Sequence, residues 1–175
     1  MTHESKTNDD GRILDAQRSC DLLAIKDLVI AYAYAVDDRD WVRWQSLFIP
    51  EARIDYTSAG GIAGTPKEVA AWMPDAMAVF SFCMHSVLTH EIRFLAEDRA
   101  QGRAHVFNRN GIEWNGQSEL VDVGAIYCDT YVRGNGAWRF ASRRERTTYI
   151  TGGSFADMIR KAAKAAAGDG AYPFG

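Results

Sequence analysis

The chain of 175 residues has few cysteines, no excess of charge of one sign and no long apolar run. Its three cysteines are far apart and form no CxxC pair, so reduced thiols are expected rather than a disulfide framework. No apolar run approaches the roughly 20 residues that a membrane-spanning helix needs. Acidic and basic residues are interspersed at a net charge of −3, without the basic stripe of a nucleic-acid-binding protein. These absences predict a cytoplasmic protein with neither a membrane nor a nucleic acid as partner.

The N-terminus also lacks a targeting signal. Residues 1–15 are polar and contain no apolar core of a signal peptide, so they are expected to form a disordered leader. The remaining length fits one domain with a single hydrophobic core. We therefore expect one domain over residues 16–155, followed by a C-terminal helix and tail over residues 156–175.

Helical periodicity dominates the first half of the chain. Apolar residues recur at three- and four-residue steps from Cys20 to Tyr34, which is typical of one face of an amphipathic helix. The segment WVRWQSLF predicts a second, short helix that Pro50 ends.

A third helix has a clear start signal. Thr65 as N-cap, Pro66 at the first helical position and Glu68 three residues after the cap form a capping-box pattern. Pro74 is expected to end or kink this helix, because proline removes a backbone hydrogen bond.

After residue 84 the pattern changes to that of β-strands. Four segments rich in β-branched and aromatic residues follow, separated by the polar connections EDRAQG, NGQS and RGNG. Helices first and strands later are typical of an α+β fold in which helices cover one face of an antiparallel sheet. If the sheet curls around those helices, the first helix and alternate strand residues line a pocket.

Three segments carry a resemblance to a known family: AIKDLVIAYAYAVDDRDWVRWQSLF, CMHSVLTHEI and GAIYCDTYVRGNGAWRF. From about Ile25 to Tyr149 the chain resembles the SnoaL-like branch of the nuclear transport factor 2-like superfamily. The resemblance implies a cone-shaped, curved antiparallel sheet wrapped around N-terminal helices. Members of the family include dehydratases of bile acids and of scytalone and a dehydrochlorinase of hexachlorocyclohexane. The resemblance also implies that no cofactor is needed.

In these relatives an Asp near the end of the first helix pairs with a His at the start of a central strand, and the matching residues here are Asp37 and His85. A neutral imidazole can take a proton from carbon near neutral pH. A carboxylate on its other nitrogen fixes the tautomer and stabilises the imidazolium. Asp37 follows the apolar segment YAYAV and so is expected to face the pocket. The alternative is a structural histidine whose hydrogen bonds a nearby Asp satisfies.

His90 lies five residues after His85. Five residues along an unbroken strand reverse the face, so His90 is expected on the outer face of the sheet. The same parity argues against a metal pair, and zinc would want three or four ligands. We therefore predict no metal site.

Three further residues are candidate catalytic groups. Tyr32 stands five residues before Asp37, where the dehydratases have a Tyr, and its phenol could donate to a leaving group; the alternative is a core aromatic residue. Asn108 stands where the bile-acid dehydratase has an Asp, and an amide cannot replace a proton-donating carboxyl group. Arg143 matches an Arg of the dehydrochlorinase and could stabilise a leaving anion or an enolate, unless it is a solvated strand charge.

These residues predict a cofactor-independent lyase, dehydratase-like in the first instance, or an isomerase or cyclase acting on a small hydrophobic, cyclic substrate. One alternative is a non-catalytic structural subunit similar to the small subunit of ring-hydroxylating dioxygenases; another is a ligand-binding accessory domain. A homodimer or homotrimer is expected through the outer sheet face. The residues expected to contact the substrate are Trp41, Phe48, Tyr56, Met84, Val87, Ala125 and Tyr127.

Overall fold

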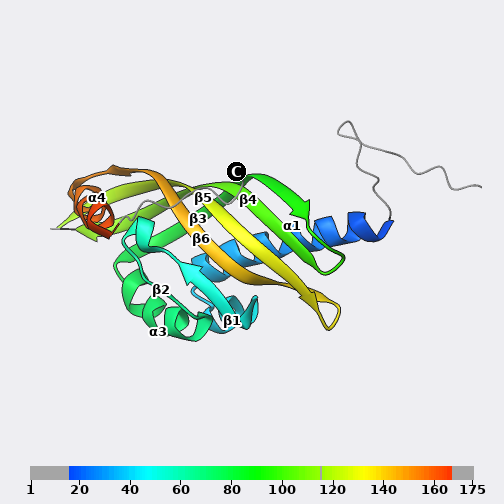
Figure 1. The fold of residues 1–175 in the computed structure, drawn as a ribbon. Coiled ribbons are helices and arrows are strands. Elements are labelled where there is room, and N and C mark those ends of the chain that lie inside the picture. Colours follow the sequence, from blue (N-terminus) through cyan, green and yellow to red (C-terminus); the bar gives the residue numbers. More distant parts are fainter. Residues whose placement is uncertain (1–15, 115, 167–175) are drawn as a thin grey trace, which may run out of the picture.

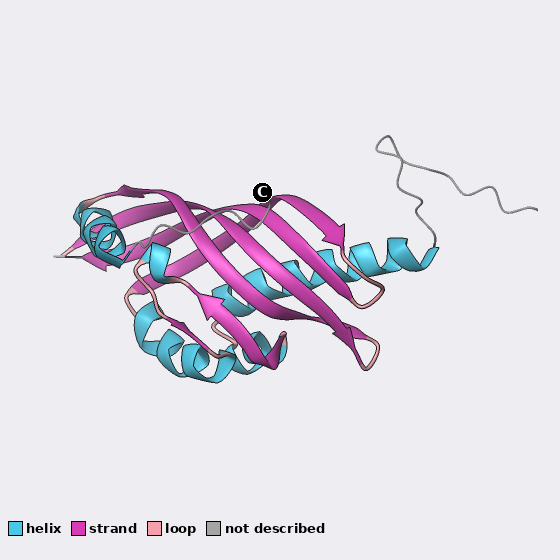
Figure 2. Cartoon of the chain, in the orientation of Figure 1, coloured by secondary structure: helices cyan, strands magenta, loops and turns pink. Residues whose placement is uncertain are grey.

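The structure is a computed structural model that describes residues 16–114 and 116–166 (Figures 1 and 2). The predicted leader and the last part of the predicted tail lie outside the described residues. Within these ranges, no helix combines the length and the apolar character needed to cross a membrane. The elements are α1 (Ala16–Asp37), α2 (Trp41–Ser46), β1 (Phe48–Asp55), η1 (Thr57–Ala59), β2 (Ala63–Gly64), α3 (Pro66–Met77), β3 (Phe80–Phe94), β4 (Arg99–Trp114), β5 (Gln117–Gly134), β6 (Ala137–Gly152) and α4 (Ser154–Ala166).

Six strands form one open sheet in the order β2-β1-β6-β5-β4-β3. The four long strands are antiparallel neighbours, whereas β1 pairs with β6 in parallel. The predicted α+β cone fold is therefore confirmed, but the sheet is mixed rather than wholly antiparallel. In Figure 1, α1 runs along one face of the curved sheet, α3 lies beside β1 and β2, and α4 covers the end of β6.

Local sequence signals explain the start of α3 but not the helix ends expected at the two prolines. The capping box at the start of α3 is confirmed, because Thr65 and Glu68 hydrogen-bond reciprocally. Pro74 lies inside α3, which continues to Met77, so Pro74 does not end the helix. The second helix ends at Ser46, and Pro50 lies within β1 instead of ending a helix. Pro50 is tolerated there because the pairing of β1 with β6 is interrupted between Phe48 and Arg53.

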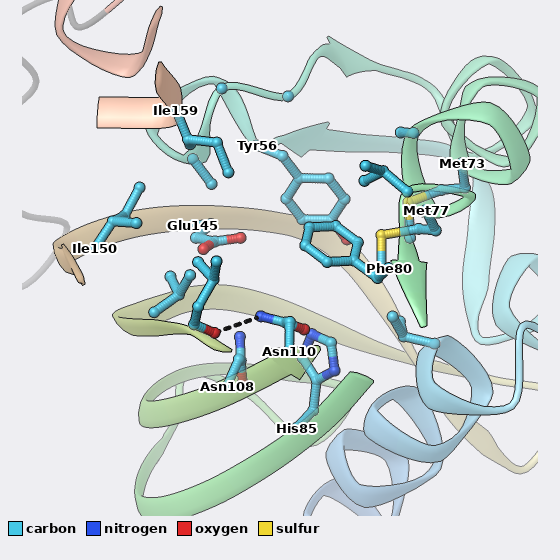
Figure 3. Close-up of a pocket in the computed structure, with 18 of the residues that line it drawn as sticks. Tyr56, Met73, Met77, Phe80, His85, Asn108, Asn110, Glu145, Ile150 and Ile159 are labelled. Atoms are coloured by element: carbon cyan, nitrogen blue, oxygen red, sulfur yellow. Dashed lines mark hydrogen bonds between the residues drawn. The ribbon is translucent and has the colours of Figure 1, made fainter. Parts of the chain in front are cut away.

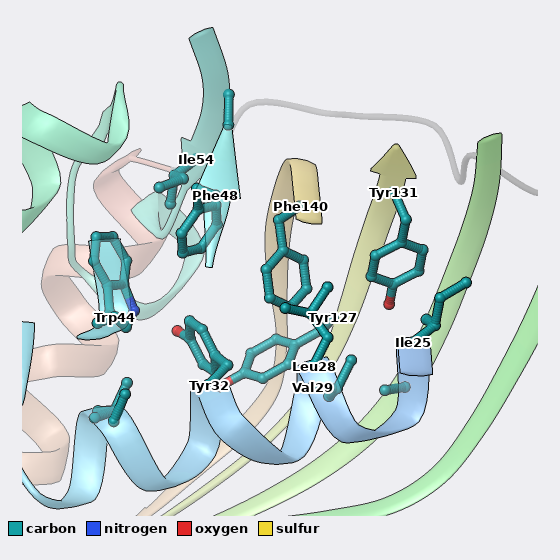
Figure 4. Close-up of a cluster of buried hydrophobic side chains, with 14 of the residues drawn as sticks. Ile25, Leu28, Val29, Tyr32, Trp44, Phe48, Ile54, Tyr127, Tyr131 and Phe140 are labelled. Atoms are coloured by element: carbon teal, nitrogen blue, oxygen red, sulfur yellow. The ribbon is translucent and has the colours of Figure 1, made fainter. Parts of the chain in front are cut away.

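An aromatic core fills the space between α1 and the sheet (Figure 4). Tyr32 from α1 contacts the rings of Trp44, Phe48, Tyr127 and Phe140 at centroid distances of 5.8 to 6.3 Å. Each of these five side chains is at least 95% buried. Because aromatic groups remove large areas from water, this cluster fixes how α1 lies on the sheet.

A β-bulge in β3 changes the face on which half of the strand projects. Val87 pairs with Val106 and His90 pairs with Ala104, so three residue steps on β3 lie opposite two on β4. The extra residue restores His90 to the inner face, where its Nε2 lies 3.1 Å from the hydroxyl of the buried Tyr131. The prediction that His90 lies on the outer face is wrong, because it assumed an unbroken strand.

Candidate active site

A cavity of about 490 Å³ lies between the inner face of the sheet and the helices α1, α3 and α4 (Figure 3). Its walls are mostly apolar, with Trp72 and Met73 from α3, Phe80 from β3 and Phe155 from α4. A volume of this size is typical of sites that enclose a small organic ligand. The polar lining residues are Tyr32, Tyr56, His85, Asn108, Asn110, Tyr127 and Glu145.

His85 lines this cavity, and Asp37, which contacts His85, is not itself a lining residue. Asp37 is the last residue of α1, and its Oδ2 accepts a hydrogen bond of 2.9 Å from the backbone N–H of His85. Its Oδ1 lies 2.6 Å from His85 Nδ1. The carboxylate therefore selects the tautomer with hydrogen on Nδ1, so that Nε2 keeps its lone pair. The side chains of Asp37 and His85 are 21% and 12% exposed, so the pair is reachable but shielded from bulk water.

Two tyrosines form a second polar group in the cavity wall. The hydroxyl groups of Tyr32 and Tyr56 lie 2.7 Å apart and share one hydrogen bond. Burial raises the pKa of Tyr32, and it raises that of Tyr56 well above the ordinary value. Both phenols are therefore neutral hydrogen-bond donors at physiological pH.

Asn108 lies directly across from His85 in the pairing of β3 with β4. It is 5% exposed and lines the cavity, and its Oδ1 has no hydrogen-bond partner among the described residues. A buried amide oxygen without a protein partner costs free energy, which a bound ligand with a donor group would recover. Asn110, on the same strand, instead donates from Nδ2 to the backbone oxygen of Val121 at 3.3 Å.

Glu145 is a cavity residue that the sequence analysis missed. It lies in β6 opposite Tyr127 and is 9% exposed. Burial raises its pKa to about 7, although Arg143 acts in the opposite direction. Its place in the charged segment SRRER is typical of a solvated strand. Strand parity was the available signal, since a residue two positions after an inward-facing Arg143 shares its face.

Arg143 is buried behind the cavity instead of facing it. Its side chain is 0% exposed, and Nε and Nη2 donate to the two carboxylate oxygens of Asp129 at 2.8 and 2.7 Å. The guanidinium centre lies 3.9 to 4.3 Å from the ring centroids of Tyr32, Tyr127 and Phe140. Arg143 thus supports the tyrosines from behind and does not reach a ligand in the cavity.

The other residues expected to contact a substrate divide between core and surface. Tyr56 and Tyr127 line the cavity. Phe48 and Ala125 are buried in the core, and Trp41 and Val87 pack against it; none of these four lines the cavity. Met84 is 48% exposed and follows Cys83 on β3, pairing with Arg109 on the opposite face from His85. The structure therefore does not bring Met84 to the cavity.

The SnoaL-like domain family matches residues 17–144 of the chain. An uncharacterized protein of Mycobacterium tuberculosis is 29% identical over 136 residues, which are 78% of this chain and 91% of that protein. Gamma-hexachlorocyclohexane dehydrochlorinase of Sphingobium indicum is 26% identical over 137 residues, which are 78% of this chain and 86% of the enzyme.

Solved structures share the fold. Hexachlorocyclohexane dehydrochlorinase type 3 of Novosphingobium barchaimii has a TM-score of 0.69 at 24% identity, covering 81% of this chain and 95% of that one. A scytalone dehydratase-like protein of Novosphingobium aromaticivorans has a TM-score of 0.69 at 22% identity, covering 77% and 89%. At such identities the likeness shows a common cone fold, and the chemistry has to be argued from the side chains.

Proposed function

Because the chain belongs to the SnoaL-like domain family, we propose that it is a cofactor-independent lyase of the dehydratase or dehydrochlorinase type, or an isomerase, acting on a small hydrophobic, cyclic substrate. One observation carries this proposal. The Asp37 carboxylate holds His85 through both Nδ1 and the backbone N–H, at the wall of a mostly apolar cavity. This arrangement supports a neutral imidazole that acts as a general base toward a carbon-bound proton.

The first step is common to elimination and isomerisation. His85 Nε2 takes a proton from a carbon next to an electron-withdrawing group, and Asp37 stabilises the imidazolium that forms. In an elimination, the electron pair of the broken C–H bond forms a carbon–carbon double bond while a leaving group departs from the next carbon. In an isomerisation, His85 returns the proton to a different carbon.

Three neutral groups in the cavity wall support the stabilisation of negative charge as it develops. The Tyr32 and Tyr56 hydroxyls share one hydrogen bond, so one phenolic hydrogen of the pair is free to be donated to a substrate oxygen. The Asn108 amide lies across from His85 and can orient a carbonyl group or a water molecule. Fixed donors in a site with little water stabilise an oxyanion strongly.

The cavity lining supports an apolar ring as the substrate. The walls contain Trp72, Met73, Met77, Phe80 and Phe155, and none of the described Lys and Arg side chains lines the cavity. Such walls favour an uncharged alicyclic or aromatic ring, held by its faces, over a phosphorylated or carboxylated compound.

Hydrogen exchange in deuterium oxide tests the base directly. Proton NMR of a panel of cyclic ketones, decalone included, is expected to show faster loss of the hydrogens next to the carbonyl group with the protein than without it. His85→Ala and Asp37→Asn are each expected to reduce this rate about 10²-fold or more, because general-base catalysis contributes about 10²–10⁴-fold. The matched controls are His105→Ala and Asp38→Asn, both at exposed positions.

The outcome separates the proposed enzyme from the alternatives. Exchange that is unchanged in His85→Ala would refute the dyad as the base. A ligand-binding domain could bind ketones and a structural subunit need not bind them. In both cases the hydrogen-exchange rate of the ketone would be no higher than with His85→Ala. The cytoplasmic location and the homodimer or homotrimer stay predictions, and size-exclusion chromatography with light scattering measures the second.

A further inference from the structure

Glu145 is a buried carboxyl group in the cavity wall that the proposed base chemistry does not use. It belongs to β6, pairs with Tyr127 of β5 and is 9% exposed. Figure 3 shows its carboxyl group in the same space as His85 of β3, Asn108 of β4 and Tyr56, which follows β1. A substrate in this cavity would therefore meet His85 from β3 and Glu145 from β6.

The carboxyl group of Glu145 is not paired with any of the described residues around it. Among the described residues, its side chain makes no hydrogen bond and no ion pair; only its backbone oxygen accepts, from Ser58 at 2.7 Å. The guanidinium of Arg143, two residues earlier on the same strand face, is already held by Asp129. The other titratable groups that line the cavity are Tyr32, Tyr56, Tyr127 and His85.

The protonation of Glu145 suits a proton donor. Burial raises its pKa to about 7, so a large share of the carboxyl groups carry a proton at neutral pH. A carboxyl group with a pKa near the working pH is an efficient general acid. Asn108 cannot take this role, because a neutral amide has no proton to give up.

We infer that Glu145 is the general acid of the site, which protonates a hydroxyl leaving group while His85 removes the carbon-bound proton. The inference rests on the proposed function, because it needs His85 as the base. The C–H electron pair becomes the new double bond, and the C–O bond breaks with its pair going to oxygen. The Glu145 proton joins that oxygen to give water. Transfer of the proton from His85 through solvent to the Glu145 carboxylate then restores the starting state.

This assignment narrows the reaction within the proposed class. A chloride leaves as a stable anion and needs no proton, whereas hydroxide is a poor leaving group until it is protonated. An acid in the cavity wall therefore favours substrates that lose water. The substrate class is a cyclic β-hydroxy ketone or an equivalent compound with an acidic C–H bond next to the carbon that bears the hydroxyl.

Two substrates that differ only in the leaving group test the inference. β-Hydroxydecalone and β-chlorodecalone both give the same conjugated enone, whose ultraviolet absorbance reports elimination. Glu145→Gln is expected to lower kcat/KM for β-hydroxydecalone about 10²-fold or more, because the amide cannot protonate the leaving group. The rate with β-chlorodecalone and the hydrogen exchange of decalone should stay close to those of the unmodified protein. Glu91→Gln, at an exposed position of β3, is the matched control.

The failures of the two proposals are distinguishable. If Glu145→Gln loses kcat/KM equally for β-hydroxydecalone and β-chlorodecalone, or for neither, Glu145 is not the acid, even where His85→Ala still abolishes hydrogen exchange. If hydrogen exchange persists in His85→Ala, His85 is not the base. The assignment of Glu145 as the acid then fails as well, because it needs that base.

A second measurement does not depend on turnover. In protein with isotope-labelled glutamate, the side-chain carbonyl resonance that is absent from Glu145→Gln should titrate with a midpoint near 7. It should also shift on addition of β-hydroxydecalone and much less on addition of decalone, which lacks the hydroxyl group. A resonance that titrates like a solvent-exposed glutamate, or that β-hydroxydecalone leaves unmoved, refutes the inference.

Discussion

Two polar regions share the inner face of the sheet, and they differ in whether their polar groups have partners. In the cavity, Asn108 Oδ1 has no partner and the Glu145 carboxyl group makes no ion pair among the described residues. Further along the face, His90 Nε2 lies 3.1 Å from the Tyr131 hydroxyl, which donates to Asp129, and Asp129 accepts two hydrogen bonds from Arg143. We call these last four residues the closed network.

This difference distinguishes polar groups that stabilise the fold from polar groups that are able to bind a ligand. Within the closed network, one Arg143 nitrogen, Nη1, lacks a hydrogen-bond partner, and three aromatic rings around the guanidinium compensate for it. Buried polar groups with partners make the core rigid and specific. The cavity groups keep unused hydrogen-bonding capacity close to a general base. On one continuous sheet face, the lack of partners identifies the chemical site better than residue type does.

Breaking the closed network should cost the most stability. Asp129→Ala leaves Arg143 buried and unpaired, so the free energy of unfolding is expected to fall by about 3–5 kcal/mol. Urea unfolding followed by circular dichroism measures this change. The control is Asp122→Ala, which breaks a pair of nearly identical geometry, Arg109 with Asp122, where Arg109 is 43% exposed. A similar loss in both variants would contradict the view that burial makes the closed network structural.

Removing the cavity acid should instead change the pH dependence of stability. The pKa of Glu145 rises from 4.5 in the unfolded chain to about 7 in the folded one, so folding favours its protonated form. Its favourable contribution is complete below pH 4.5 and is lost as pH rises through 7. The free energy of unfolding of Glu145→Gln, relative to that of the unmodified protein, should therefore increase by about 3 kcal/mol as the pH rises from 4.5 to 8. Urea titrations at several pH values test this, and a difference that does not vary with pH would contradict a buried acid.

His90 of the closed network should have a smaller effect on the pH dependence of stability than Glu145, and of opposite sign. Burial lowers the pKa of His90 to about 4 in the folded protein. The unfolded chain therefore binds a proton first as pH falls below 6.5, and stability is lost between pH 6.5 and 4. His90→Gln should remove this loss, which is about 1–2 kcal/mol after allowance for solvent screening. The control is His105→Gln, on an exposed position, and an equal change in that variant would argue against burial as the cause.

These two slopes oppose each other between pH 4.5 and 6.5, because Glu145 destabilises the fold as pH rises and His90 stabilises it. The two effects should therefore cancel in part in the unmodified protein over this range. The variants Glu145→Gln and His90→Gln are therefore needed to measure the contribution of each residue separately.

The sequence was sufficient for the fold class and for the residues whose role depends on local order. The capping box of α3 depends only on neighbouring residues, and it was predicted correctly. The approach of Asp37 to His85 across 48 positions came from the family resemblance and not from periodicity. The mixed sheet was missed, because the parallel pairing of β1 with β6 joins distant segments and leaves no local pattern.

The remaining errors have physical causes that a single sequence hides. Phe48 was placed in a helix and in the substrate site, but it begins β1 and packs on Trp44 and Phe140 at centroid distances of 4.7 and 4.9 Å. Arg143 was expected to reach a ligand, but its partner Asp129 lies on the neighbouring strand, where only the register reveals it. Glu145 was hidden by the charged residues beside it.

The bulge in β3 makes this strand sensitive to its own length. One residue removed between Val87 and His90 would let β3 pair regularly with β4 without the bulge, so His85 and His90 would both still face inward, four residue steps apart. Two residues removed together would leave three steps, which turn His90, Ile92 and Phe94 toward solvent and separate the dyad from the closed network. The turn that contains Asn135 and Gly136 carries no such constraint, since it joins β5 to β6 outside the paired region. Deletions among relatives should accordingly be free at that turn, whereas between Val87 and His90 the loss of one residue should occur and the loss of two should not.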